Sequence, residues 1–183
     1  MDIVKGGVSG KVLLTLMFKS CDFMLALLRE HNTSQSVIDC FDYLYGLLSP
    51  LIFRSLFPVI LTDNGSEFSN PSALEFDSSG KRRTHIFYCD PNSSWQKPNV
   101  ELNHEFIRRI IPKGVSMNAL TQTDIDLMMS HINSYSREKL NSISTIEMFD
   151  FFYGEGLAKK LGQAKIPSNH ILLRLSLLEW SDL

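Results

Sequence analysis

Asp63 is the residue of this 183-residue chain whose surroundings most clearly indicate chemistry. It ends an apolar run that begins at Pro58, and the Asn64-Gly65 pair after it is a turn signal, so the run is typical of a short buried strand. A carboxylate at the end of a buried strand is costly unless a partner compensates its charge, and a metal ion is one such partner. Two more carboxylates, Asp2 and Glu101, could complete a metal-binding set.

The three carboxylates come from segments that a fold could bring together. Asp2 starts the first expected strand, and Glu101 lies in the first turn of an expected helix. If the strands of Asp2 and Asp63 are neighbours, the two side chains can face each other, and the helix can bring Glu101 over them. Three carboxylates around one cleft suit hard divalent cations. Two such ions could activate a water or hydroxyl group and stabilise the leaving oxygen in phosphoryl transfer.

Each of these residues also has a purely structural interpretation. The Asp63–Gly65 segment could be only a hairpin turn. Glu101 could stabilise its helix through the helix dipole, and Asp2 stands beside a chain end, where order is often low. Glu67 and Glu105 could take the same chemical roles, and Glu105 shares a helix face with Glu101.

Two other kinds of site match the sequence poorly. His85, Cys89 and His104 do not have the spacing of a zinc finger. The Gly6–Lys11 segment resembles a phosphate-binding loop, but its first glycine is misplaced and Val12 stands where Ser or Thr is required. We therefore interpret this segment as a turn between strands.

Hydrophobic periodicity and capping signals predict the elements that must position these residues. Short connections favour an antiparallel meander at the start of the chain. Ser or Thr followed three residues later by an acidic residue marks helix starts, and the polar segment 90–98 is expected to be a loop. This order of elements predicts an α/β layer fold. The expected strands are Asp2–Val4, Lys11–Phe18, Phe23–Arg29, Pro58–Asp63 and Thr84–Cys89, and the expected helices begin near Thr33, Asn99, Thr121 and Ser144, with a short closing helix at Ile171–Leu178.

The composition indicates a folded protein without a general affinity for polyanions. Hydrophobic residues make up 44% of the chain, enough for a core, and the formal net charge is −2. A slight negative charge argues against general nucleic-acid binding. Contact with DNA would depend on the basic clusters Lys81–Arg83 and Arg108–Arg109 with Lys113, and on Trp95, which could stack on an unpaired base.

Cysteine usage and hydropathy indicate where the protein works. Three widely spaced cysteines without a Cys-x-x-Cys pair fit free thiols in a reducing cytoplasm. The chain does not open with a basic segment that leads into an apolar one. Charged residues interrupt the apolar stretch Val12–Leu28, so a membrane span is not expected.

Four motifs resemble the catalytic core of insertion-sequence-30 type transposases, which belong to the retroviral-integrase superfamily. The similar region extends from Asp2 to about Gly154. The resemblance implies a ribonuclease-H-like fold in which a five-stranded mixed sheet is flanked by helices, with the catalytic core at 2–160 and a C-terminal extension at 161–183. The motifs are Ile60-Leu-Thr-Asp-Asn-Gly-Ser-Glu-Phe68, Tyr88-Cys-Asp-Pro91, Ser94-Trp-Gln-Lys97 and Glu101-Leu-Asn-His-Glu-Phe-Ile-Arg-Arg109.

The resemblance also implies a function. Asp2, Asp63 and Glu101 would be the catalytic, metal-binding triad, Mg²⁺ or Mn²⁺ the cofactor, and DNA at transposon ends and target the substrate, handled by a homo-oligomer during synapsis. Pro98 stands where the wider superfamily commonly has a glycine, and the family's upstream DNA-binding segment is not in this sequence. The alternative is a catalytically inactive fragment that keeps the fold for DNA or protein interaction. A ribonuclease-type hydrolase is a third interpretation.

Overall fold

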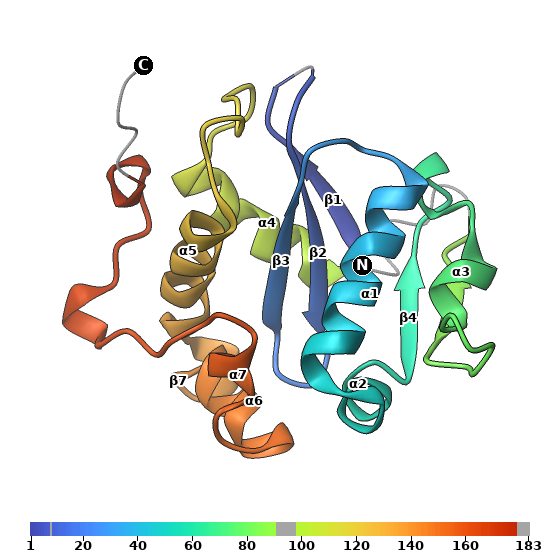
Figure 1. The fold of residues 1–183 in the computed structure, drawn as a ribbon. Coiled ribbons are helices and arrows are strands. Elements are labelled where there is room, and N and C mark those ends of the chain that lie inside the picture. The colour runs from blue at the N-terminus through green and yellow to red at the C-terminus, as the bar shows by residue number, and fades with distance from the viewer. Residues whose placement is uncertain (8, 91–97, 179–183) are drawn as a thin grey trace.

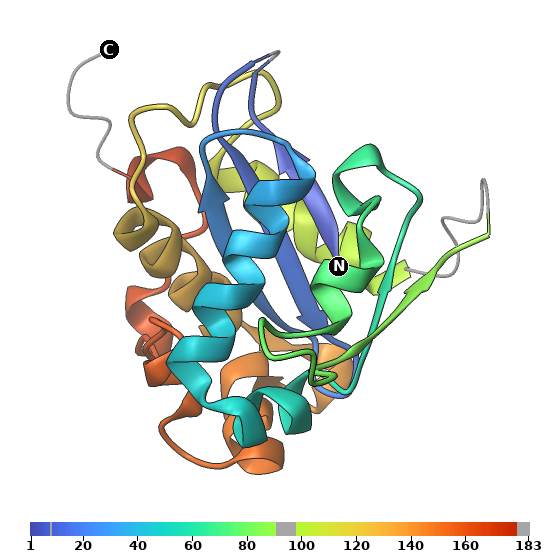
Figure 2. The same cartoon turned by 45° about the vertical axis from the view of Figure 1, so that its right-hand side comes forward.

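The protein is an α/β structure in which two sheets lie between two groups of helices (Figures 1 and 2). The computed structural model describes residues 1–183 except 8, 91–97 and 179–183. Helices α1 and α2 cover one face of the first sheet, and α4 and α5 cover the other. The predicted α/β class is therefore confirmed.

The strands of the described residues form sheets of three, two and two strands. The first sheet is antiparallel in the order β1-β2-β3, and the second pairs β4 with β5 in parallel. The predicted strands are confirmed, but a single five-stranded sheet is not. The bounds are β1 Asp2–Lys5, β2 Val12–Phe18, β3 Phe23–Arg29, β4 Val59–Thr62 and β5 His85–Tyr88, with a small hairpin of β6 Ser136–Arg137 and β7 Ile143–Ser144.

Capping signals in the sequence begin several of the helices. Thr33, Thr121 and Ser144 each accept a hydrogen bond from the backbone three residues on, in capping boxes, and start α1, α5 and α6 as predicted. No single helix of the described residues is long and apolar enough to cross a membrane. Helices α1 and α2 reach that length and apolar composition only when they are taken together, and the chain bends by 117° between them. The helices are α1 Ser34–Leu48, α2 Pro50–Leu56, α3 Pro71–Glu75, α4 Pro98–Ile110, α5 Gln122–Ser134, α6 Thr145–Tyr153 and α7 Leu157–Lys160.

The predicted closing helix at Ile171–Leu178 is wrong. Short 3₁₀ turns at Ser168–His170 and Leu175–Leu177 stand there instead. The backbone nitrogen of Leu172 donates to Nδ1 of His131 on α5 at 3.0 Å, so a side chain takes the place of a helical carbonyl. Leu178 is buried against α4 and α5, which accounts for the apolar composition without a helix.

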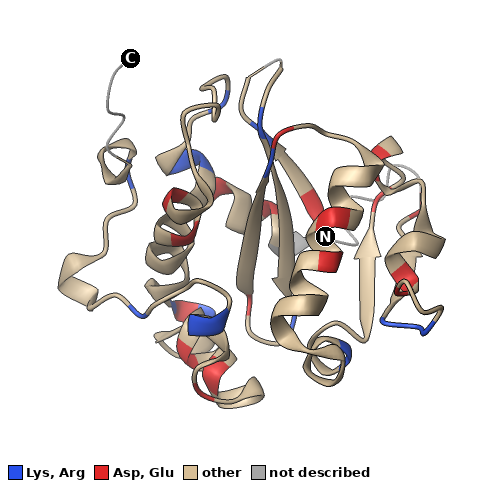
Figure 3. Ribbon diagram, in the orientation of Figure 1, with Lys and Arg blue, Asp and Glu red and all other residues tan. Residues whose placement is uncertain are grey.

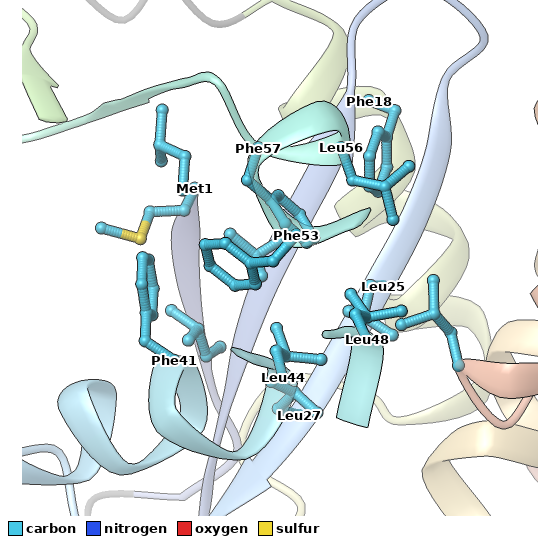
Figure 4. Close-up of a cluster of buried hydrophobic side chains, with 14 of the residues drawn as sticks. Met1, Phe18, Leu25, Leu27, Phe41, Leu44, Leu48, Phe53, Leu56 and Phe57 are labelled. Atoms are coloured by element: carbon cyan, nitrogen blue, oxygen red, sulfur yellow. The ribbon is translucent and has the colours of Figure 1, made fainter. Parts of the chain in front are cut away.

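Successive side chains of β2 and β3 point to opposite faces of the first sheet, so the buried side chains form two clusters. Leu14, Leu16 and Phe18 face α1 and α2, whereas Leu13 faces α4 and α5. Met1 belongs to the first cluster, and Figure 4 shows its side chain directed toward Phe41 of α1. The first sheet is therefore buried on both faces, which explains why its strands are almost continuously apolar.

Amide side chains close the outer edge of β3. Asn133, which is fully buried on α5, accepts from the Met24 nitrogen at 3.1 Å and donates to the Met24 carbonyl at 2.8 Å. Gln122, near the start of α5, accepts from the Leu28 nitrogen at 2.8 Å and donates to the Ala26 carbonyl at 3.0 Å. These amides take the place of a neighbouring strand along the edge.

We predict that Asn133→Leu lowers the free energy of unfolding by about 2 to 4 kcal/mol, because the buried backbone nitrogen of Met24 loses its acceptor. Gln122→Leu is the matched control: it removes the same kind of edge contact at a half-buried position, where water can replace the amide, and should cost less than about 1 kcal/mol. Chemical denaturation of both variants measures the two losses. Equal losses would contradict this account of the edge.

Candidate functional site

Asp63 lies directly after β4, where the chain leaves the sheet. Its Oδ1 atom accepts from the Gly65 nitrogen at 3.0 Å, which forms a compact turn. The Asn64 side chain donates to the Cys89 carbonyl at 2.9 Å, so the turn is fastened to the end of β5. Since β5 runs parallel to β4, the alternative that Asp63–Gly65 forms a hairpin turn is wrong.

Gly65 allows two carboxylates to lie close together. A Cβ atom at this position would come within 3.1 Å of Asp63 Oδ1 and within 2.9 Å of Glu67 Oε2. The backbone of Gly65 is not in the left-handed region, so the need for glycine comes from space and not from conformation. The structure therefore brings Glu67 beside Asp63.

Asp2 lies at the start of β1, next to the end of β4. The Met1 nitrogen donates to the Leu61 carbonyl at 2.5 Å, and the Thr62 hydroxyl donates to the Met1 carbonyl at 3.5 Å. The Asp2 side chain is half-buried, and its Oδ1 accepts from the Ile3 nitrogen at 2.8 Å. The Met1 contacts therefore bring the start of β1 beside the end of β4, although β1 and β4 belong to separate sheets in the described residues.

Helix α4 lies along β1 and β2 and is fixed at several points. The Arg108 guanidinium donates to the Lys5 carbonyl at 2.8 Å, and the Asn103 amide donates to the Asp22 carbonyl at 3.3 Å. Between them, Nε2 of His104 and the Thr15 hydroxyl are 2.9 Å apart. These contacts hold the helix against the sheet beside Asp2.

The Thr15 hydroxyl connects His104 to the backbone of Asp2. This hydroxyl donates to the Asp2 carbonyl at 3.1 Å. Because a hydroxyl has one proton, His104 must then be the donor in its own contact with Thr15. Sequence reasoning considered His104 only as a zinc ligand and missed this positioning contact, because nothing in the local sequence relates positions 15 and 104.

Glu101 lies on the exposed side of the first turn of α4. It lines an open surface cavity of about 520 Å³ together with His104, Glu105, Arg108 and Arg109. Both candidates for the third carboxylate, Glu101 and Glu105, are exposed there. Burial lowers the pKa of the Arg108 guanidinium, but this group keeps its charge at neutral pH.

The carboxylates do not form a ready metal centre. Within the part of the chain that the structure describes, no three Asp, Glu, His or Cys side chains are placed to hold a metal ion. The structure brings the strands of Asp2 and Asp63 together and places α4 beside them, and the triad that includes Glu101 stays a prediction.

The two predicted basic clusters differ in structure. Arg83 is a core residue, with 2% of its surface exposed, and it donates to the carbonyls of Ala73 and Leu74 and to the Asp42 carboxylate. The expectation that Lys81–Arg83 forms one basic surface cluster is therefore wrong for Arg83. Arg109 and Lys113 are exposed at and beyond the last turn of α4. Figure 3 shows basic and acidic residues distributed over both helix layers. Trp95 lies outside the described residues.

The known proteins whose sequences are similar to this chain are named as an integrase and as transposases. The chain is 31% identical to integrase ORF3 of Spiroplasma virus SpV1-R8A2 B over 149 residues, which are 81% of this chain and 44% of that protein. It is 24% identical to the transposase for insertion sequence element IS1086 of Cupriavidus metallidurans over 147 residues, 80% of this chain and 41% of that protein.

A shorter match reaches the transposase InsI for insertion sequence element IS30A of Escherichia coli, with 33% identity over 79 residues, 43% of this chain and 19% of that protein. No protein-family model matches the chain. The chain spans less than half the length of the curated relatives it matches.

We predict that Thr15→Val lowers the free energy of unfolding by about 1 to 2 kcal/mol, because the buried hydroxyl that joins Asp2 and His104 is removed while the shape is kept. Thr15→Ser is the control that keeps the hydroxyl, and it should retain the chemical shifts of the His104 ring that Thr15→Val changes. Urea denaturation and NMR of the ring measure the two effects. If the serine variant also shifts the His104 signals, the hydroxyl is not what positions the helix.

Proposed function

We propose that this chain, which belongs to the transposase and integrase type of protein, is a catalytic core that cuts and joins DNA during transposition. The observation that carries the proposal is the contact of Met1 with Leu61, because it sets the start of the strand of Asp2 beside β4, which Asp63 directly follows. The fold would be ribonuclease-H-like, with the two larger sheets as parts of one mixed sheet. The core would span 2–160, with 161–183 as an extension.

Asp2 and Asp63 would hold Mg²⁺ or Mn²⁺, and Glu101 would complete the ligand set. Carboxylate oxygens are the ligands that these ions prefer, so the residue types fit the cofactor. When bound, the ions would supply activation of the attacking oxygen and stabilisation of the leaving oxygen. Since the described residues contain no ready cluster of three ligands, completion of the set would require the first turn of α4 to approach the two aspartates.

The chain's own residues would hold and orient the DNA. Arg108 and Arg109 line the cavity that contains Glu101, and Lys113 follows the end of the same helix. Guanidinium and ammonium groups at this place suit the phosphates on either side of a cut bond. His104 and Thr15 would act at a distance from the DNA by fixing α4 over Asp2. A homo-oligomer at the synaptic stage belongs to the same proposal.

We predict that Asp63→Asn abolishes Mn²⁺-dependent processing of a branched DNA oligonucleotide, with a reduction greater than the ~10–100-fold typical for an outer partner of a metal site. Asparagine keeps the oxygen that accepts from Gly65, so the turn should persist and circular dichroism should be unchanged. Glu67→Gln is the matched control, because it neutralises the carboxylate beside Asp63 that the proposal does not use.

The outcome of this experiment separates the two functional interpretations. Retained processing in Asp63→Asn would contradict the triad assignment. No processing by the folded, unchanged chain would favour the inactive remnant, and absence of Mg²⁺ binding in a calorimetric titration would support that interpretation. Cleavage of RNA in a hybrid without strand joining would indicate a ribonuclease-type hydrolase instead.

We also predict that the double change Arg109→Ala with Lys113→Ala weakens binding of DNA oligonucleotides and reduces the dependence of log K on log salt by about 2, one unit for each phosphate that the protein no longer neutralises. Fluorescence anisotropy at several salt concentrations measures the slope. The control is Lys81→Ala with Arg82→Ala, which removes two exposed charges from the other basic segment. Equal slopes for all three proteins would contradict a DNA contact at the end of α4.

A further inference from the structure

Tyr135 is a large aromatic residue that lies exposed at the C-terminal end of α5. It directly follows the last residue of this helix, and 42% of its surface is exposed. Its ring centroid lies 5.6 Å from that of Phe106 on α4, in a tilted arrangement. The contact with Phe106 holds the Tyr135 ring beside α4, the helix that carries Glu101.

An open cavity of about 390 Å³ lies beside Tyr135. Its lining consists of one aromatic, two aliphatic and two hydroxyl side chains, those of Tyr135, Ile171, Leu173, Ser136 and Ser168. The hydrogen bond from the Leu172 nitrogen to His131 holds the C-terminal segment along α5 (Figure 1). An aromatic ring, aliphatic walls and two hydroxyl groups suit a flat ligand that has a polar edge.

Two guanidinium groups lie against the neighbouring ring of Phe106. The guanidinium carbon of Arg137 is 4.1 Å from the centroid of this ring, and that of Arg109 is 4.8 Å from it. The guanidinium carbon of Arg137 also lies 5.9 Å from the Tyr135 centroid. Because cations bind to aromatic faces, Phe106 holds two like charges next to Tyr135.

Carboxylates compensate these two charges incompletely. Neither Arg109 nor Arg137 forms an ion pair within the part of the chain that the structure describes. Arg137 is 6% exposed and donates to the Asn103 side chain at 2.9 Å, but its Nε atom has no hydrogen-bond partner there. Burial lowers the pKa of the Arg137 guanidinium; Asp22, which is paired with Lys139, opposes this effect, and the charge of Arg109 adds to it. An anion bound at the exposed Arg109 would supply the negative charge that this cluster lacks.

Arg109 joins this cluster to the cavity of the candidate site. Its side chain lines the cavity that contains Glu101 and also lies over Phe106, which contacts Tyr135. A DNA strand whose phosphates pass Glu101 and Arg109 would therefore bring a base to the cavity at Tyr135. Neighbouring bases cover both faces of a base inside a duplex, so the base that lies on the Tyr135 ring must be unpaired and unstacked.

We propose that the cavity at Tyr135 binds the base of one unpaired nucleotide of the DNA substrate, with Arg109 at its phosphate. The base stacks on the Tyr135 ring, and the two serine hydroxyls of the cavity can bond to its polar edge. The inference rests on the proposed function, because it takes the nucleotide from the DNA strand held beside Glu101. It assigns the recognition of an unpaired strand, as distinct from a duplex, to this end of α5.

The test compares two DNA probes in a buffer with EDTA, where no metal-dependent cleavage occurs. One probe is a blunt duplex, and the other is the same duplex with a single-stranded extension. Fluorescence anisotropy measures the dissociation constant of each probe for the full chain. Tyr135→Ala should weaken binding of the extended duplex about fivefold or more and leave binding of the blunt duplex unchanged. Tyr135→Phe keeps the ring and should bind both probes as the unchanged chain does.

Two further variants make the test specific. Tyr43→Ala removes an exposed tyrosine from α1, on the other helix layer, and should change neither dissociation constant. Ser168→Leu narrows the cavity from an exposed position and should weaken binding of the extended duplex only. Circular dichroism and the constant for the blunt duplex report whether each variant is folded.

Two kinds of result would overturn the proposal. If Tyr135→Ala leaves binding of the extended duplex unchanged, or weakens both probes equally, no base lies on the ring. If free deoxyadenosine monophosphate competes with the extended duplex at equal concentration, the cavity belongs to a free nucleotide instead. Asp63→Asn should bind both probes as the unchanged chain does, so a failure of the catalytic assignment is distinguishable from a failure of this site.

Discussion

The hydrogen bond between the Met1 nitrogen and the Leu61 carbonyl is the contact on which the arrangement of the site depends. Together with the Thr62 contact beside it, this hydrogen bond joins the first sheet to the second in the described residues. If this contact separates, β1 stays with β2 and Asp63 stays with β4. The placement of Asp2 beside the end of β4 therefore depends on this backbone junction and on the packing of Met1 in the interior cluster.

Contacts of α4 stabilise the first sheet on the face opposite to α1 and α2, close to the Met1–Leu61 hydrogen bond. Thr15 and His104 hold the helix over the Asp2 backbone, and Arg108 holds it at Lys5. The acidic candidate Glu101 is left on the solvent side of a helix whose opposite face is rigidly bound. Because one face of α4 is bound to the sheet and the other is exposed, the helix can stay in place while the exposed side chains of its first turn change rotamer.

Features with a local physical cause could be predicted from the sequence. The capping boxes at Thr121 and Ser144 satisfy backbone groups within three residues, and the apolar spacing from Ile125 to Ile132 produces one buried helix face wherever the helix lies. Asp63 was recognisable because an apolar run and a turn signal meet there.

Features that depend on distant partners could not be predicted in the same way. Arg83 stands in a run of basic residues that is typical of a surface, yet Asp42 and two carbonyls of α3 draw it into the interior. His104 finds its partner 89 positions away. The segment at 171–178 is apolar enough for a helix, but its Leu172 backbone nitrogen donates a hydrogen bond to the His131 side chain instead of to a helical carbonyl. The five-stranded sheet implied by resemblance would require β1 to pair with β4, but the strands of the described residues form sheets of three, two and two strands.

The closed outer edges of the sheets have a consequence for how copies of this chain behave when crowded. Open strand edges are the usual starting points for aggregation, because they pair with any exposed backbone. Here an approaching strand would have to displace the Asn133 and Gln122 amides on one side or, on the other, the Glu75 carboxylate that accepts from the Ile86 nitrogen of β5. Edge-to-edge pairing of folded copies is therefore disfavoured at these capped positions of β3 and β5.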